Sequence, residues 1–334
     1  MHPFLAELRR RASAQRVRIA LAESWDERVL AAASFLARWG IADPVLILHP
    51  ERVESHAAAK AIGVETCDPR EHESIKELEN LLLQRRRRRE GGLTSDEARS
   101  MALEPLYFAD FLVREGTVAG SVAGCVYTTA EVLRAAIWLV GAAPGVTTVS
   151  SAFYMAARAF RSDQPEVVTF ADCAVVPQPT AEQLADIAVA AARDRHRIVG
   201  DDPVVAFLSF STLGSADDAS VERVRQAVAI TRERNPDLRI DGELQADAAL
   251  MREVAARKAP TSPAAGWANV LIFPSLDAGN IAYKLVERIA GALAIGPIVQ
   301  GLARPCSDLS RGASTDDIIN VAAITALQSR DAGS

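Results

Sequence analysis

A repeated alternation of short apolar segments with longer segments of helical periodicity constrains the fold of this sequence more than any other feature. Residues 18–22 form the first apolar run, a helical segment follows over 26–39, and a second apolar run covers 44–49. The same order continues with a strand at 118–126 and a helix at 129–140. Because parallel strands are joined by crossover helices, this order predicts an α/β fold with a mostly parallel sheet that is covered on both faces.

Two breaks divide the pattern into parts. Pro144-Gly145 ends the first series of elements, and a second series begins directly after it. We expect the strands of the second series at 146–155, 167–176, 204–211 and 269–274, with helices between them. A further break at Ile295-Gly296-Pro297 precedes a short strand at 298–300 and a last helix at 315–327. The sequence therefore predicts two α/β domains, and periodicity alone leaves open whether the last segment returns to the first one.

The composition excludes several classes of protein. The 334 residues carry 37 basic and 43 acidic side chains, a net charge of −6, so no overall positive field favours nucleic acid. The four cysteines form no CxxC pair and are typical of reduced core residues, which predicts a cytoplasmic protein rather than a secreted disulfide scaffold. Segment 1–18 has no apolar core like that of a signal peptide, and Arg134 and Pro144 interrupt the most apolar stretch, so no membrane segment is expected.

Several common catalytic motifs are missing. The sequence has neither GxGxxG after a strand nor GxxxxGK[ST], which disfavours a dinucleotide-dependent or P-loop enzyme. Its five histidines include no HExxH pair, and no GxSxG turn is present. Zinc hydrolysis and serine hydrolysis are therefore disfavoured, and we expect a reaction that proceeds without histidine.

The segment 308–317 carries the residue types of an anion site. Arg311 offers a planar cation for phosphate or carboxylate oxygens, Gly312 lets the backbone approach a ligand, and a helix N-terminus follows. Asp317, in the first turn of that helix, would act as a general base if it faces the same ligand. Ser314 and Asp317 also have the spacing of a capping box, so capping and catalysis both remain open for Asp317. Capping does not explain the arginine in Ser310-Arg311-Gly312.

A second candidate lies at 127–134, where a strand end leads into a helix. Thr128 or Thr129 would cap this helix, and Arg134 would lie one turn inside it. Ligands of open α/β folds bind at the carboxyl ends of the strands, so we expect Thr128 and Arg134 to contact the substrate. The alternative for Arg134 is an arginine that faces solvent.

Two weaker candidates lie elsewhere in the chain. The basic run Arg85 to Arg89 ends at Gly91-Gly92, which suits a phosphate-bearing ligand, although such runs are usually solvated helix faces. Asn280 and Lys284 follow a strand and a turn in the way that pocket-lining residues do. Their alternatives are a helix cap for Asn280 and an exposed helical lysine for Lys284.

Together these strings resemble the phosphate acetyltransferase (phosphotransacetylase) family along nearly the whole chain. Many ordered matches are more specific than any single motif. The matching strings are Glu23-Ser-Trp-Asp26-Glu27-Arg28-Val-Leu, Glu104-Pro105-Leu-Tyr107-Phe, Pro144-Gly-Val, Phe170-Ala-Asp-Cys-Ala-Val175, Leu208-Ser-Phe-Ser-Thr212, Asp241-Gly-Glu-Leu-Gln245, Ala278-Gly-Asn-Ile281 and Asp308-Leu-Ser-Arg-Gly312.

The resemblance implies reversible acetyl transfer between acetyl-CoA and inorganic phosphate, which yields acetyl phosphate and coenzyme A. No metal and no bound cofactor are expected, since coenzyme A is a substrate. The implied fold is similar to that of the decarboxylating isocitrate dehydrogenases: two α/β domains flank a cleft, and the C-terminal segment returns to the first domain. The domains would span 1–145 with 297–334, and 146–296, and a homodimer would form largely through the second.

The resemblance also implies roles for individual residues. Asp317 is similar to the family's base that takes the thiol proton of coenzyme A, and Arg311 and Ser310 to the residues that stabilise the tetrahedral intermediate. Arg134 and Arg88 resemble arginines that engage phosphate groups of coenzyme A or of the acyl phosphate.

Two departures from the family pattern keep alternatives open. Tyr127 stands where the family usually has histidine, and the basic loop reads Arg88-Arg89-Glu90-Gly91-Gly92 instead of Arg-Lys-His-Lys-Gly. The alternatives are a phosphate butyryltransferase and a non-catalytic protein that senses acetyl-CoA or acetyl phosphate. An acyl-enzyme through Cys173 is disfavoured, because this cysteine lies in an apolar strand without a partner that would stabilise a thiolate.

Overall fold

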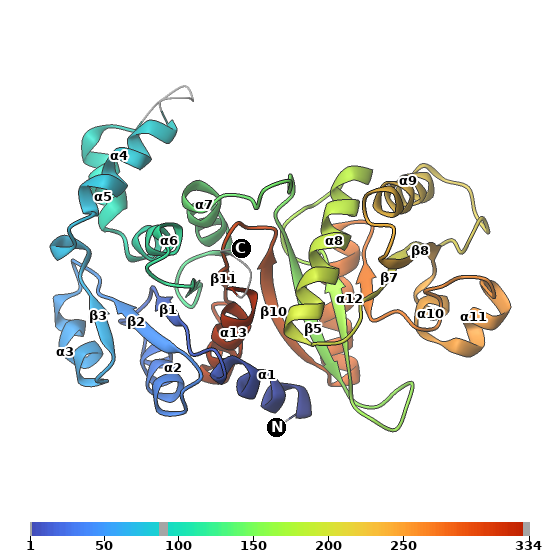
Figure 1. The fold of residues 1–334 in the computed structure, drawn as a ribbon, viewed down its shortest axis with the longest axis horizontal. Coiled ribbons are helices and arrows are strands. Elements are labelled where there is room, and N and C mark those ends of the chain that lie inside the picture. Colours follow the sequence, from blue (N-terminus) through green and yellow to red (C-terminus); the bar gives the residue numbers. More distant parts are fainter. Residues whose placement is uncertain (1, 87–92, 330–334) are drawn as a thin grey trace. The chain divides into compact units, whose positions relative to one another are not determined.

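The computed structural model of the chain describes residues 2–86 and 93–329, and the chain divides into two compact units. The first unit comprises residues 7–143 and those from 302 onward, and the second comprises 1–6 and 144–301. Helix α1 (Pro3–Ser13) contributes to both units. Each unit has its own sheet and its own helices (Figure 1), which confirms the predicted class of two α/β domains.

The sheet of the first unit is parallel throughout its described strands, in the order β11-β4-β1-β2-β3. Strand β4 lies between β1 and β11, and all three are parallel, so the loops that follow them lie at one edge of the sheet. The strands are β1 (Arg18–Leu21), β2 (Asp43–Ile47), β3 (Glu65–Cys67), β4 (Gly120–Ala123) and β11 (Cys306–Asp308).

Helices cover this sheet on both faces. They are α2 (Glu27–Arg38), α3 (Val53–Ala61), a 3₁₀ turn (Pro69–Glu71), α4 (Ile75–Arg86), α5 (Ser95–Leu103), α6 (Pro105–Glu115), α7 (Thr129–Leu139) and α13 (Thr315–Gln328). Helix α13 packs against α2 and the sheet, while α6 packs against α7 and the opposite face. Right-handed crossovers explain this division, because the chain steps one way across the sheet through α2 and α3 and the other way through α6 and α7. The C-terminal helix α13 thus completes the core of a unit that begins near the N-terminus.

The sheet of the second unit is mixed, in the order β10-β5-β6-β9-β7-β8. Strands β6, β9, β7 and β8 are parallel, whereas β5 pairs antiparallel with both of its neighbours. The strands are β5 (Ser150–Ala157), β6 (Glu166–Ala171), β7 (Val204–Leu208), β8 (Arg239–Leu244), β9 (Val270–Ile272) and β10 (Leu293–Gln300).

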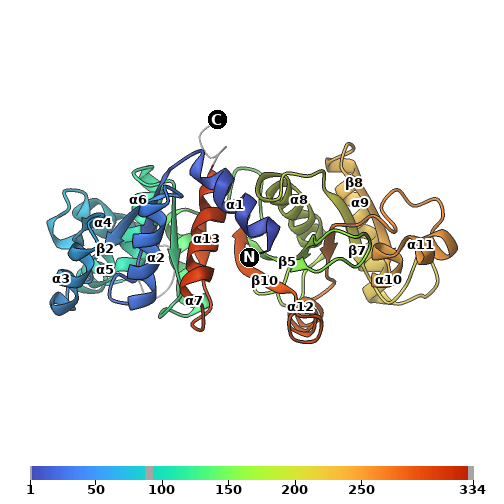
Figure 2. The ribbon, with the colours of Figure 1, turned by 90° about the horizontal axis from the view of Figure 1, so that it is seen from below.

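Helices also cover both faces of this second sheet. They are α8 (Ala181–Ile198), α9 (Ala219–Arg234), α10 (Ala246–Leu250), α11 (Arg252–Lys258) and α12 (Leu276–Ala290). Helices α8 and α12 lie on opposite sides of the sheet (Figure 2). Buried side chains from β5, β6, β7 and β9 form a core with Ala249, Ala255 and Phe273, and Tyr283 of α12 packs against it. No helix of the described chain has the length and apolar character needed to cross a membrane.

The structure corrects the sequence analysis at Ile295-Gly296-Pro297. The expected break is instead the middle of β10, with a register irregularity between Ile295 and Ile298, and the compact second unit extends to Gly301. Proline lacks the N–H that a central strand needs, but β10 lies at the edge of its sheet, where proline is tolerated. The strand before the Ser310-Arg311-Gly312 segment is therefore β11, and the expected strand at 298–300 is the second half of β10.

Candidate active site

Three loops meet at the carboxyl edge of the parallel sheet in the first unit. They follow β1, β4 and β11 and lead into α2, α7 and α13, respectively. Their contact is close, because a Cβ atom on Gly124 would lie 2.6 Å from Oδ1 of Asp308 and 2.6 Å from the nitrogen of Leu309. Gly124 also has a φ of +113°, which other residues rarely adopt. In parallel α/β sheets this edge is where ligands bind.

Glu23 holds the loop after β4 in place. Its carboxylate accepts hydrogen bonds from four successive backbone N–H groups, those of Gly124 (3.1 Å), Cys125 (2.9 Å), Val126 (2.6 Å) and Tyr127 (2.9 Å). The residue is only 1% exposed. A buried carboxylate is stable only when it accepts hydrogen bonds, and these four donors provide them. The same four hydrogen bonds fix the backbone that leads into α7.

The loop after β11 presents the predicted catalytic residues at the surface. Ser310, Arg311 and Asp317 are all exposed. Ser314 caps α13: its backbone N–H (2.9 Å) and its Oγ (2.8 Å) donate to Oδ2 of Asp317, and the N–H of Asp317 donates to Ser314 Oγ (3.2 Å). The predicted capping box is confirmed. The cap uses one carboxylate oxygen of Asp317, so it does not by itself prevent a second role for the other.

Arg134 and Arg311 both lie near the first turn of α7. Thr128 caps this helix through a capping box with Glu131. Hydrogen bonds from Thr128 lower the pKa of Glu131, and the charges of Arg134 and Arg311 lower it further. Arg134 is exposed, and its guanidinium also lies beside the hydroxyl of Tyr107, where it offsets part of the rise in pKa that burial causes. The structure therefore brings Thr128, Arg134 and Arg311 to one end of α7.

Tyr127 stands where the family pattern usually has histidine, and its hydroxyl makes a hydrogen bond within the described chain. The Oη atom donates to Oε1 of Glu104 at 2.5 Å. Burial raises the pKa of Tyr127, and the neighbouring Glu104 carboxylate raises it further. The ring lies edge-on to Trp25, which in turn lies edge-on to His49. Tyr127 thus stays neutral and holds Glu104, so it is not a base in this site.

Asp308 is a buried carboxyl directly beneath the loop that carries Ser310 and Arg311. It is 0% exposed, and neither carboxyl oxygen makes a hydrogen bond of ordinary geometry within the described chain. Burial raises its pKa to about 7, although the Thr129 hydroxyl and the Leu309 N–H lie close enough to favour the charged form. The Glu23 carboxylate raises the pKa further. Asp308 is therefore largely protonated below neutral pH.

Asn280 and Lys284 lie in the second unit on α12, one turn apart. Ser275 caps this helix, so the alternative that Asn280 is the cap is wrong. Instead, Asn280 Nδ2 donates to the carbonyl of Cys173 (3.0 Å), and Lys284 Nζ donates to Asn280 Oδ1 (2.8 Å). Burial raises the pKa of the Cys173 thiol well above its ordinary value, which disfavours a thiolate there.

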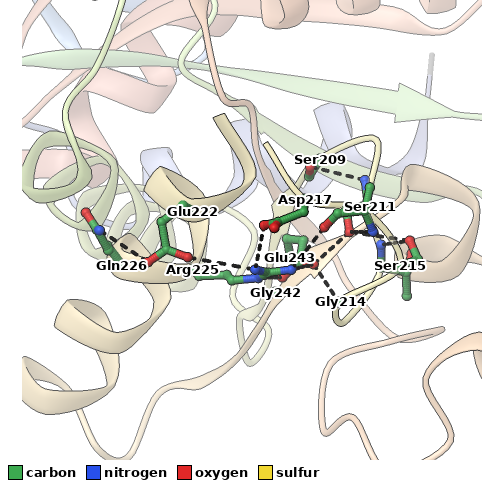
Figure 3. A network of polar contacts seen from close by, with 12 residues as sticks. Ser209, Ser211, Gly214, Ser215, Asp217, Glu222, Arg225, Gln226, Gly242 and Glu243 are labelled. Carbon is green, nitrogen blue, oxygen red and sulfur yellow. Dashed lines mark hydrogen bonds and ion pairs between the residues drawn. The ribbon is translucent and has the colours of Figure 1, made fainter. Parts of the chain in front are cut away.

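The hydroxyl-rich loop after β7 is held by a buried carboxylate network (Figure 3). Glu243 accepts hydrogen bonds from Ser211 Oγ (2.8 Å), from the Gly214 N–H (2.8 Å) and from the guanidinium of Arg225 (3.1 Å). Burial opposes the charge on Glu243, but these hydrogen bonds outweigh it and lower its pKa to about 2. These contacts hold the loop after β7 in its conformation, and no ligand is needed to account for it.

The structure leaves one expected site residue undescribed and adds others. Arg88 lies outside the described residues. Glu23, Arg28 and Asp308 were not assigned a role from the sequence, although a charged residue at or just after the end of an apolar strand was an available signal for Glu23 and Asp308. Within the described residues, no group of three or more His, Cys, Asp or Glu side chains is arranged to hold a metal ion.

A sequence profile of the phosphate acetyl/butaryl transferase family matches residues 3–326, which is nearly the whole chain. The chain belongs to this phosphate acetyl/butaryl transferase family. Both units, and all of the site residues named above, lie within the match. The assignment confirms the family resemblance deduced from the ordered strings.

Known phosphate acetyltransferases and a phosphotransacetylase structure resemble this chain over nearly its full length. The phosphate acetyltransferase of Clostridium acetobutylicum is 44% identical over 314 residues, which cover 94% of each chain. That of Acetivibrio thermocellus is 44% identical over 328 residues, or 98% of each chain. The crystal structure of a phosphotransacetylase from Streptococcus pyogenes superimposes with a TM-score of 0.88 at 38% identity and covers 98% of both chains.

Proposed function

We propose that this protein is a phosphate acetyltransferase, an acyltransferase that moves an acetyl group reversibly between coenzyme A and inorganic phosphate. One observation carries the proposal: the Ser310-Arg311-Gly312 loop and Asp317 are exposed together at the carboxyl edge of a parallel sheet. Family membership supports it. The substrates are acetyl-CoA and phosphate in one direction, and acetyl phosphate and coenzyme A in the other.

The family resemblance supplies the residue roles, and the residue types at this edge suit them. Asp317 takes the thiol proton of coenzyme A, and the thiolate sulfur forms a bond to the carbonyl carbon of acetyl phosphate. The carbonyl electrons move to oxygen, where Arg311 and Ser310 stabilise the developing charge. The intermediate then collapses, the bond between the acetyl carbon and the phosphate oxygen breaks, and phosphate leaves. No bound metal or cofactor takes part in this sequence.

The remaining site residues act in binding. Arg134 engages phosphate groups of the substrates, and Thr128, the N-cap of the same helix, is assigned to substrate binding with it. Arg88, Asn280 and Lys284 complete the proposed set of substrate-binding residues. Transfer is direct rather than through an acyl-enzyme, since the buried Cys173 thiol is held protonated.

Thiol release by the purified protein tests the function. Acetyl-CoA, propionyl-CoA and butyryl-CoA are each supplied with and without phosphate, in the absence of added metal. We expect phosphate-dependent release of coenzyme A that is fastest with acetyl-CoA. Preference for butyryl-CoA would retain the mechanism but change the acyl group. Binding of acetyl phosphate without any turnover would contradict the proposed enzyme activity and favour a protein that senses acetyl phosphate.

We also propose that the protein is a homodimer that forms through α12 of the second unit. Ile281, Leu285 and Ile289 follow one another at helical spacing on this helix and are 57%, 51% and 80% exposed. Gly279 is the one residue of α12 that is buried, and the structure describes the whole helix. Monomeric proteins rarely expose such an apolar row, and a two-fold axis would pair it with itself.

Leu285→Glu is expected to convert the dimer into a monomer, because it places a charge in the apolar row. Size-exclusion chromatography with light scattering measures the mass. Val53→Glu is the matched control, since Val53 is a 57% exposed aliphatic residue on α3 of the other unit. A monomeric wild type, or a Leu285→Glu variant that keeps the dimer mass, would exclude this interface.

We further propose a cytoplasmic location. The described cysteines are all free, and Cys125, Cys173 and Cys306 are buried. This is typical of a reducing compartment. Fractionation of the source cells would test the location.

A further inference from the structure

Arg28 links the three loops at the carboxyl edge of the first unit's sheet. Its Nη1 donates to the backbone carbonyls of Arg311 (2.9 Å) and Ala313 (2.8 Å), both in the loop after β11. Its Nη2 donates to the carbonyl of Cys125 (3.1 Å), in the loop after β4. Arg28 itself lies in the first turn of α2, directly after the β1 loop.

The remaining donors of Arg28 bind Asp26. Nε donates to Asp26 Oδ1 (3.0 Å) and Nη2 donates to Asp26 Oδ2 (2.7 Å). A guanidinium has five N–H groups, so these five hydrogen bonds use all of them. Its charge is balanced by the Asp26 carboxylate, whose pKa it lowers. Arg28 therefore has neither a free donor nor an unbalanced charge with which to bind a substrate anion.

Apart from its pair with Asp26, Arg28 makes its guanidinium hydrogen bonds to backbone carbonyls. Hydrogen bonds to the carbonyls of Arg311 and Ala313 fix both sides of Gly312, which is the most conformationally free residue of the loop. The position of this loop's backbone determines where the exposed Arg311 side chain begins. It also determines where α13, which carries Asp317, starts. Only a planar fork with several diverging donors can bridge these three carbonyls and a carboxylate at once.

We propose that Arg28 is a positioning residue for acetyl transfer: it fixes the backbone around Arg311 relative to the loop that begins α7. The inference rests on the proposed function for its kinetic consequence, but the loop-fixing role does not depend on turnover. Catalytic groups that are misplaced by about 1 Å can lose roughly 100-fold in rate, so fixing this loop matters for the reaction.

The chain contains a matched control in the Asp68–Arg70 pair. Asp68 caps a helical turn as Asp26 does, and it accepts hydrogen bonds from the Arg70 N–H (3.0 Å), from Nε (3.0 Å) and from Nη2 (2.6 Å). The corresponding N–H bond of Arg28 to Asp26 is 2.9 Å. Both arginines thus make the same local motif, but Arg28 adds the contacts to the other two loops.

Arg28→Lys and Arg70→Lys are compared for acetyl transfer and for thermal unfolding. Lysine keeps the charge but cannot span the three carbonyls, so we expect Arg28→Lys to lose roughly 100-fold in kcat, with the KM for coenzyme A changed by less than about threefold. Arg70→Lys should match the wild type in both constants. Added guanidinium ion should restore part of the activity of Arg28→Ala and have no effect on the wild type.

Hydrogen exchange gives a readout that does not require activity. In Arg28→Lys, we expect faster exchange at the amides of 310–314 and 125–128 and unchanged exchange in the rest of the first unit. Faster exchange across the whole unit, unchanged exchange in these loops, or a kcat within about twofold of the wild type would overturn the inference. If the wild type turns over no acyl-CoA, the proposed function fails while the exchange result still decides the loop-fixing role.

Discussion

Asp317→Asn is expected to lower kcat by roughly 10²- to 10⁴-fold, the range by which a positioned general base accelerates a reaction. Asparagine cannot accept the thiol proton at neutral pH. Its side-chain oxygen can still accept the hydrogen bonds from the Ser314 N–H and Oγ, so the start of α13 should remain folded. The measurement is steady-state thiol release, with circular dichroism to compare helix content.

Glu97→Gln provides the control for helix capping. Thr94 and Glu97 form a capping box at α5 in which Glu97 Oε2 accepts from the Thr94 N–H (2.8 Å) and Oγ1 (3.0 Å), close to the distances at Ser314 and Asp317. This variant should alter the cap in the same way and keep full activity. If Asp317→Asn retains more than about a tenth of the wild-type kcat, Asp317 is a cap and not the base.

Asp308→Asn is expected to stabilise the protein at neutral and higher pH relative to the wild type. The pKa of Asp308 in the folded protein is about 7, against an ordinary value of 3.8. The folded state therefore holds this proton more tightly than the unfolded state. The wild type loses free energy of unfolding as pH rises from about 4 to about 7, by up to about 4 kcal/mol at full ionisation. Asparagine stays neutral at every pH, so the Asp308→Asn variant does not lose this free energy of unfolding.

Urea unfolding at a series of pH values between 4 and 8 measures the effect. The difference in free energy of unfolding between Asp308→Asn and the wild type should grow as pH rises to about 7 and then level off. Asp110→Asn is a companion variant, because burial also raises the pKa of that carboxyl to about 7. A difference that does not change with pH would show that Asp308 is not protonated in the folded state.

Local sequence patterns predicted the parts of the site that depend on neighbouring residues. The capping box of Ser314 and Asp317, and Thr128 as the cap of α7, involve residues within four positions of each other. Such contacts form whenever the helix forms, so spacing and residue type are sufficient to predict them. Strands β1, β2, β4, β5, β6, β7 and β9 were predicted near their observed positions for a similar reason, since each contains a short apolar run.

Contacts between distant segments were not predictable from the sequence. The hydrogen bond from Arg28 to the Arg311 carbonyl joins residues 283 positions apart, and it exists because β1, β4 and β11 are neighbours in the sheet. Strand β10 continues through Gly296 and Pro297 because it lies at a sheet edge, which is a property of the strand order. Strands β3, β8 and β11, which the sequence analysis did not predict, likewise depend on the partners beside them.

The sequence by itself determined the α/β class, the family, the caps of α7 and α13 and the residue types of the catalytic segment. Each of these follows from short-range periodicity or from ordered strings along the chain. Only the tertiary structure decided that Glu23 and Arg28 hold the loops after β4 and β11, and that Asp308 is buried beneath Arg311. The physical reason is that burial and strand order set which donors meet which acceptors, and neither quantity is encoded in any one segment.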